Sequence, residues 1–86
     1  MPARVAVPVL EARIDKATTL TASDRRHKGF LVGALGRLKA PETVSYLESL
    51  FEHESDSELR LAIAWALKEV TGRDYGPAYD PWMQGR

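Results

Sequence analysis

Hydrophobic residues recur at helical spacing in four segments of the chain. Apolar side chains three or four positions apart lie on one face of an α-helix, so each segment predicts an amphipathic helix. The helices are expected from 7 or 8 to about 17, from 24 to 39, from about 40 to 53 and from 56 to 70. Their predicted apolar stripes are, in chain order, Leu10 and Ile14; His27, Phe30, Leu31, Ala34, Leu35 and Leu38; Val44, Leu47, Leu50 and Phe51; and Leu59, Ala62, Ile63, Ala66, Leu67 and Val70.

The start of the first helix has two interpretations. Residues 4–7 alternate in a way that also fits a short β-strand. A lone strand leaves its backbone groups unpaired, whereas Pro8 suits the first turn of a helix, where its missing N–H is no loss. We therefore expect a helix that begins near Pro8 and no strand anywhere in the chain.

Capping residues mark the other helix ends. Ser23 or Asp24 is expected to cap the second helix, because both side chains accept hydrogen bonds from free N–H groups. Ser55, followed three residues later by Glu58, fits a capping box for the fourth helix. Gly72 can take the left-handed conformation that ends a helix.

Residues 24–38 and 56–70 are two versions of one helix, displaced by 32 positions. The displacement aligns Asp24 with Asp56, Lys28 with Arg60, Leu31 with Ile63, Ala34 with Ala66, Leu35 with Leu67 and Leu38 with Val70. A helical repeat with a period in the low thirties is typical of an α-solenoid.

These elements predict one all-α domain over residues 1–86. Helices 7–17 and 24–39 form one hairpin and the later two form a second, stacked as a short α-α superhelix. The repeats span about 7–71, and an irregular tail follows over 72–86. Solenoids need about three repeats to bury a continuous core, so two repeats leave the N-terminal face uncovered. A homodimer or another protein partner is expected to cover it.

Residues 40–72 resemble one unit of the HEAT-like repeats, the kind also found in phycobilisome lyases. In such repeats an acidic turn leads into an inner helix with a pattern that Asp56, Leu59 and Arg60 match. The tail from 71 to 82 is similar to the segment that closes many HEAT-like solenoids. The resemblance implies that the chain holds the C-terminal end of a solenoid. It specifies the fold better than the function, because HEAT-like repeats serve as scaffolds, as pigment-enzyme domains and as nucleic-acid readers.

Charge is divided unevenly, although the chain is neutral overall. Residues 1–40 hold eight Lys or Arg against three Asp or Glu, and residues 41–86 hold four against nine. These halves can attract each other within one monomer or head to tail between copies. The absence of cysteine removes disulfides and zinc–thiolate sites. No apolar run approaches the roughly 18 residues of a membrane helix and no signal peptide is recognised, so we expect a cytoplasmic protein without membrane contact.

A basic cluster begins the helix expected over 24–39. Arg25, Arg26 and Lys28 lie at the positive end of the helix dipole and need a negative partner. Acidic residues of this chain, of a second copy, or the phosphates of a nucleic acid can supply it. HEAT-like DNA glycosylases contact phosphates through basic inner helices, and Arg37 extends the basic character of this one. Nucleic-acid binding is therefore an alternative function.

Three glycines leave a groove along the same helix. Gly29, Gly33 and Gly36 each cost about 1 kcal/mol relative to alanine in a helix, so their presence indicates close packing. Their counterparts in the next repeat include Leu61 and Trp65. Either the fourth helix seats Leu61 and Trp65 toward this groove, or a helix from a partner lies there.

Candidates for catalysis or metal binding are few. His53 and Glu54 resemble the dipeptide with which HEAT-like deoxyhypusine hydroxylases bind iron, but that family uses several such pairs, and this chain has one. His53 is expected to be solvated at a helix C-terminus. His27 stands where the repeat has an aliphatic residue, and we expect it to be partly buried and structural. We expect no catalytic residue, no metal site and no cofactor.

Aromatic residues gather in the tail. Trp82 is expected either to fold back and cap the open end of the solenoid or to anchor a partner protein. Tyr75 and Tyr79 lie nearby in the sequence.

The sequence therefore predicts a non-catalytic protein-interaction or scaffold module that uses the inner face of helices 24–39 and 56–70. A nucleic-acid binder and a small-ligand or enzyme accessory subunit are the alternatives. The candidate partner-binding residues are Arg25, Arg26, Lys28, Gly29, Gly33, Arg37, Leu61, Trp65 and Trp82.

Overall fold

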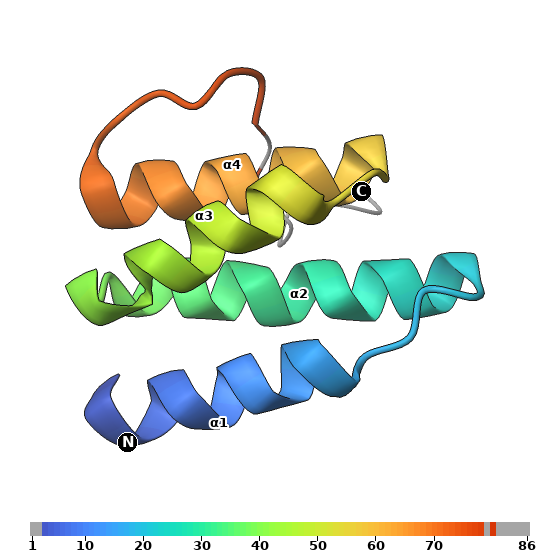
Figure 1. Ribbon diagram of the computed structural model, residues 1–86, viewed down its shortest axis with the longest axis horizontal. Coiled ribbons are helices and arrows are strands. Elements are labelled where there is room, and N and C mark those ends of the chain that lie inside the picture. The colour runs from blue at the N-terminus through green and yellow to red at the C-terminus, as the bar shows by residue number, and fades with distance from the viewer. Residues whose placement is uncertain (1–2, 79, 81–86) are drawn as a thin grey trace.

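The computed structural model describes residues 3–78 and 80, and over these it is an all-α fold without strands. Four helices, α1 (Ala3–Lys16), α2 (Ala22–Leu38), α3 (Val44–His53) and α4 (Ser57–Thr71), form two antiparallel hairpins. A short 3₁₀ turn, Pro41–Thr43, leads into α3. The hairpins stack so that α2 lies between α1 and α4, and the tail after α4 passes back over that helix (Figure 1). This is the predicted two-hairpin superhelix.

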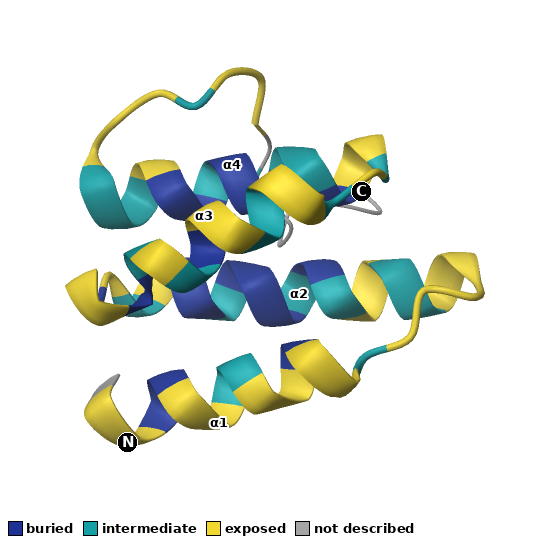
Figure 2. Ribbon diagram, in the orientation of Figure 1, coloured by how far each residue is buried: buried dark blue, intermediate teal, exposed yellow. Residues whose placement is uncertain are grey.

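The core lies where α2 packs against α4, the most extensive contact between helices. Its fully buried members include Leu35 from α2, Ile63 and Leu67 from α4, and Leu47 from α3. Figure 2 shows the buried residues on the sides of the helices that face one another. The apolar stripes of the two inner helices therefore meet as the repeat predicts.

The first helix begins earlier than expected. The structure starts α1 at Ala3, so residues 4–7 are helical and Pro8 lies inside the helix. A proline there removes one backbone hydrogen bond and disfavours the helix. Ala6 and Val7 are only 8% and 4% exposed, and their burial against the core offsets that cost, while Pro8 faces solvent.

Both N-caps differ from the predicted residues. Thr21, rather than Ser23 or Asp24, caps α2, with its hydroxyl accepting from the Asp24 N–H at 3.0 Å. Asp56, rather than Ser55, caps α4. Its carboxylate accepts from the N–H three residues on, at 3.0 Å. The cap is the last residue with extended backbone before the helix, and both Thr21 and Asp56 are extended.

The helix ends follow the sequence more closely. Gly72 takes the left-handed conformation after α4, with φ of 76°. Lys39 ends α2 in the same way, with φ of 52°. The left-handed conformation costs a lysine more than a glycine, so packing of α2 rather than local preference sets this end.

The position of the α4 cap gives the first prediction. Asp56→Ala is expected to lower the free energy of unfolding by about 1 kcal/mol, because it leaves an α4 N–H without its acceptor. Ser55→Ala is the matched control and is expected to change it by less than about 0.5 kcal/mol. Urea denaturation of both variants makes the comparison. Equal losses, or a larger loss for Ser55→Ala, would contradict this cap assignment.

His27 is exposed and not partly buried as predicted. The repeat aligns it with Leu59, which is 2% exposed in α4. α2 extends past the beginning of α4 at this end (Figure 1), so the first turns of α2 have less covering helix above them. The apolar stripe of α2 therefore begins later than the periodicity indicates.

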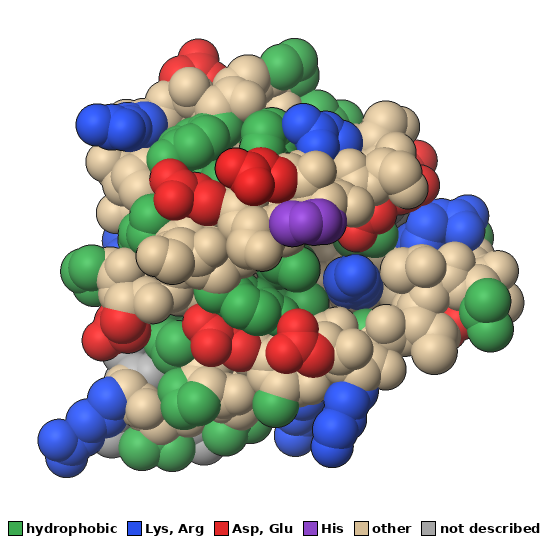
Figure 3. Space-filling model, viewed as in Figure 1, with side chains coloured by type: hydrophobic (Ala, Val, Ile, Leu, Met, Phe, Trp, Pro, Cys, Tyr) green, Lys and Arg blue, Asp and Glu red, His purple; other side chains and the backbone are tan. Residues whose placement is uncertain are grey.

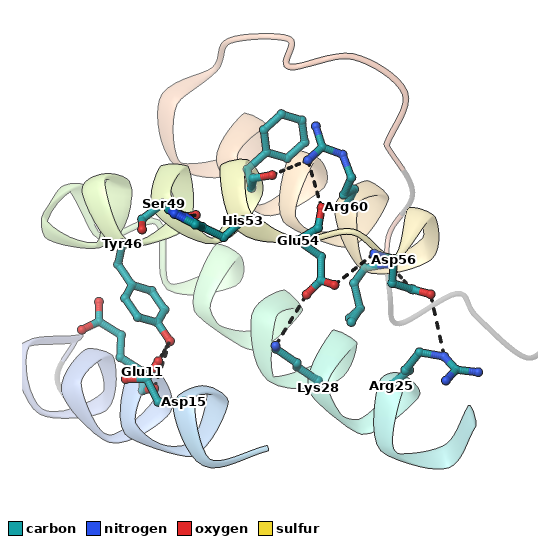
Figure 4. A network of polar contacts seen from close by, with 12 residues as sticks. Glu11, Asp15, Arg25, Lys28, Tyr46, Ser49, His53, Glu54, Asp56 and Arg60 are labelled. Atoms are coloured by element: carbon teal, nitrogen blue, oxygen red, sulfur yellow. Dashed lines mark hydrogen bonds and ion pairs between the residues drawn. The ribbon is translucent and has the colours of Figure 1, made fainter. Parts of the chain in front are cut away.

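Polar contacts join the outer helices α1 and α3. Tyr46 Oη donates to Asp15 Oδ1 at 2.7 Å and lies 3.1 Å from the Glu11 backbone oxygen. Thr43, which is fully buried, donates its hydroxyl to the Glu11 carboxylate at 3.1 Å. Burial, the hydrogen bond to Asp15 and the negative charges of Asp15 and Glu11 raise the pKa of Tyr46, so the phenol stays protonated. Figure 4 shows Tyr46 directed toward α1.

Candidate interaction surfaces

The acidic turn between α3 and α4 pairs with the basic side of α2. Lys28 Nζ lies 3.6 Å from Glu54 Oε1, and both side chains are about 15% exposed. Arg25 Nε lies 3.8 Å from Asp56 Oδ1, at a more exposed position. Figure 4 shows both pairs spanning from α2 to this turn. The negative partner that the basic cluster requires is therefore supplied within the chain.

Arg60 fixes the same turn from the other side. Its guanidinium donates to the backbone oxygens of Phe51 and of Glu54, the latter at 3.1 Å. It also lies over the Phe51 ring, 4.1 Å from the ring centroid. Glu54 accepts from the Asp56 N–H at 3.1 Å. Arg60 is the repeat equivalent of Lys28. Both basic residues contact the turn between α3 and α4, Lys28 from α2 and Arg60 from α4.

The glycine groove of α2 is filled by α4. Gly29, Gly33 and Gly36 are buried. A Cβ at Gly36 would lie 2.7 Å from Ala66 Cα and 3.1 Å from Trp65 Cζ3. Trp65 therefore packs at the groove, which is the intramolecular alternative. Gly29 and Gly33 are buried in the interior of the chain.

Arg37 joins α2 to the tail. Its Nη2 lies 2.8 Å from Asp80 Oδ2, and its guanidinium lies 5.3 Å from the centroid of the Trp65 ring. The described tail thus returns from α4 to α2 and crosses beside Trp65. Trp82 lies outside the described residues, so its role as a cap or as an anchor stays a prediction.

Two further residues considered in the sequence analysis are exposed. Arg26 faces solvent on α2, and His53 faces solvent at the end of α3 with Nδ1 2.8 Å from the Ser49 backbone oxygen. That is the solvated helix end expected for His53. Within the described residues no group of three His, Cys, Asp or Glu side chains is placed to hold a metal ion. None of the described helices is long and apolar enough to cross a membrane.

The outer face of α1 carries apolar side chains that none of the other described helices covers. Val5 and Val9, one turn apart, are 45% and 42% exposed. α2 covers the opposite side of α1, and the exposed residues follow the edge away from it (Figure 2). In a solenoid this face stacks on a neighbouring repeat. The structure therefore has the uncovered N-terminal face that a count of two repeats predicts.

A notch of about 320 Å³ opens at the other end of the molecule. It is lined by Phe51, Ser57, Arg60, Leu61, Tyr75 and Pro77. Tyr75 meets the edge of Phe51 with ring centroids 6.3 Å apart, and its hydroxyl donates to Glu48 at 3.3 Å. We name this site the tail notch. Leu61 lines this site.

Sequence reasoning missed the tail notch. The sequence places Phe51 on the apolar stripe of its helix and Tyr75 among the aromatic residues of the tail, and nothing in it brings the two together. The one weak indication of this site in the sequence is the aromatic content of the tail. The helix ends at Gly72, and the chain that follows returns toward α3. The site itself forms only when three separate segments come together.

Comparison with known proteins agrees with the repeat architecture. The model of the family described as HEAT repeats matches residues 10–78, from within α1 to the tail. The match spans both hairpins and most of the chain. Comparison with curated proteins and with solved structures gives no match.

Proposed function

The chain belongs to the HEAT repeat family, and from this we propose that it is a non-catalytic protein-interaction module that pairs with a second copy of itself through α1. HEAT repeats commonly serve as scaffolds for protein interactions. The observation that carries the proposal is the exposed pair of valines on α1. A cytoplasmic location is part of this proposal.

The spacing of the valines suits a two-fold contact. If two α1 helices cross antiparallel, Val5 of one copy meets Val9 of the other, and the reverse contact forms at the same time. Such a self-complementary patch is the usual basis of a symmetric dimer. Burial of these side chains contributes about 25 cal/mol for each Å² of apolar surface removed from water.

The charge distribution does not drive this association. Arg25 and Lys28 pair with acidic residues of the same chain, and Arg37 pairs with Asp80. This supports the view that the basic and acidic halves complement each other within the monomer. It also weakens the case for nucleic acid on α2, because a phosphate would have to displace these internal carboxylates.

Acidic substitution on α1 tests the proposal. Val5→Glu with Val9→Glu is expected to weaken dimerisation by at least about a hundredfold, because the contact would bury charges without partners. Leu20→Glu is the matched control: Leu20 is 87% exposed in the loop after α1, and its change is expected to leave the dimer intact. Sedimentation equilibrium over a range of concentrations gives the dissociation constants.

Two results would contradict the proposal. The first is a wild-type chain that stays monomeric at all concentrations. The second is a doubly substituted chain that dimerises as tightly as the wild type while its circular dichroism spectrum stays helical.

A further inference from the structure

We propose that the tail notch is a second docking site, which takes an apolar side chain of a partner protein flanked by lysine or arginine. The notch lies between the end of α3, the beginning of α4 and the tail. The α1 face lies at the opposite end of the stack, with α2 between them (Figure 1). The site is therefore independent of the proposed dimer contact.

The notch has the size and lining of a side-chain pocket. Its volume of about 320 Å³ is at the lower end of the range of roughly 300–1,000 Å³ found for small-molecule pockets. Most of its lining is apolar, from Phe51, Leu61, Tyr75 and Pro77. Burial of a leucine or aromatic side chain in such a site stabilises a complex without any large movement of the backbone.

Internal contacts hold the walls of the notch in place. The edge-to-face contact between Phe51 and Tyr75 fixes the tail against α3, and the hydrogen bond from Tyr75 to Glu48 adds to it. Arg60 donates to two backbone oxygens and stacks on Phe51. Its charge is thus directed at the end of α3, so it is not the main receptor for an anion.

The border of the notch is acidic. Glu48 and Glu52 are exposed on α3, on either side of Phe51 in the sequence. Figure 3 shows hydrophobic side chains between α3 and the tail, with acidic side chains along the α3 edge. Complementary charge steers association and selects among partners. A cationic segment with an apolar residue fits this border better than an acidic segment or a nucleic acid does.

Peptide titration tests the site. Three nonapeptides are added to ¹⁵N-labelled protein: a central leucine among lysines, a central leucine among glutamates, and a central alanine among lysines. We expect amide shifts at Phe51, Ser57 and Leu61 with the first peptide, with dissociation constants of about 1 mM, and none with the other two. Binding is expected to weaken as salt rises, because the border charges are exposed.

A charge substitution beside the notch makes the test specific. Glu52→Lys is expected to weaken binding of the leucine–lysine peptide about fivefold, since it replaces an attraction by a repulsion. Glu42→Lys is the matched control, an equal charge change at an exposed residue in the 3₁₀ turn before α3, and is expected to leave binding within about twofold.

Three outcomes would overturn the proposal: no shifts at the notch at several millimolar peptide, equal shifts with the alanine–lysine peptide, or equal weakening by the two glutamate substitutions. The chain with Val5→Glu and Val9→Glu keeps an intact notch and is expected to bind the peptide normally. Failure of the dimer and failure of the notch are therefore separate results.

Discussion

Gly36→Ala is expected to lower the free energy of unfolding by about 2–3 kcal/mol, even though alanine is the better helix former. The new Cβ would lie 2.7 Å from Ala66 Cα and 2.9 Å from Ala66 Cβ. Ala66 Cα is a backbone atom of α4 and Cβ is fixed to it, so neither can rotate away from the new methyl group. The helices α2 and α4 therefore have to move apart to admit it. That movement loosens the most extensive helix contact of the fold and outweighs the gain of about 1 kcal/mol in helix propensity.

Gly29→Ala is the matched control on the same helix. The nearest atom to its added Cβ is Leu59 Cδ2 at 3.9 Å, an ordinary contact distance. Here the helix propensity of alanine prevails, and we expect a stabilisation of about 0.5–1 kcal/mol. Urea denaturation of the two variants should give changes of opposite sign. A stabilised Gly36→Ala chain would contradict the close approach of α2 and α4.

Leu47→Ala is expected to lower the free energy of unfolding by about 3 kcal/mol. Leu47 is the fully buried residue of α3, whereas Val44, Leu50 and Phe51 pack against the core while only partly buried. Its loss leaves a cavity under α3 and removes the main apolar contact that holds the helix on α4. Leu20→Ala is the control, at a loop residue that is 87% exposed. Its free energy of unfolding is expected to stay within about 0.5 kcal/mol of the wild-type value. Similar losses for both leucines by thermal or urea denaturation would mean that α3 does not pack as described.

The arrangement of the inner helices was predictable because it depends on periodicity. The displacement of 32 positions aligns Leu31 with Ile63 and Leu35 with Leu67, and all four side chains are buried. Both inner helices carry the same apolar stripe, and each is joined to an antiparallel outer helix. Few arrangements of the two hairpins bury both stripes. The repeat therefore indicates the stacking as well as the helices themselves.

The helix ends were less predictable because several neighbours can cap equally well. Thr21, Ser23 and Asp24 all have side chains that accept a hydrogen bond, and the backbone conformation decides which one does. Pro8 shows the same limit: its local preference for a first turn was overridden by the burial of Ala6 and Val7.

The surfaces were the least predictable part. The sequence showed that the basic residues of α2 need negative partners, but not that Lys28 meets Glu54 in the same chain. These residues are distant in sequence and come together only through the stacking of the hairpins. The tail notch requires α3, α4 and the tail at once, and no short pattern encodes such a site.

Association through α1 is tested most simply by the mass of the wild-type chain in solution, measured by light scattering at low and at high salt. We expect a dimer of about 19 kDa, twice the chain mass of 9.6 kDa, that persists at high salt because valines on α1 form the contact. A mass of 9.6 kDa throughout would contradict the association through α1. A dimer that dissociates at high salt would also contradict it and would assign the contact to the charged halves of the chain.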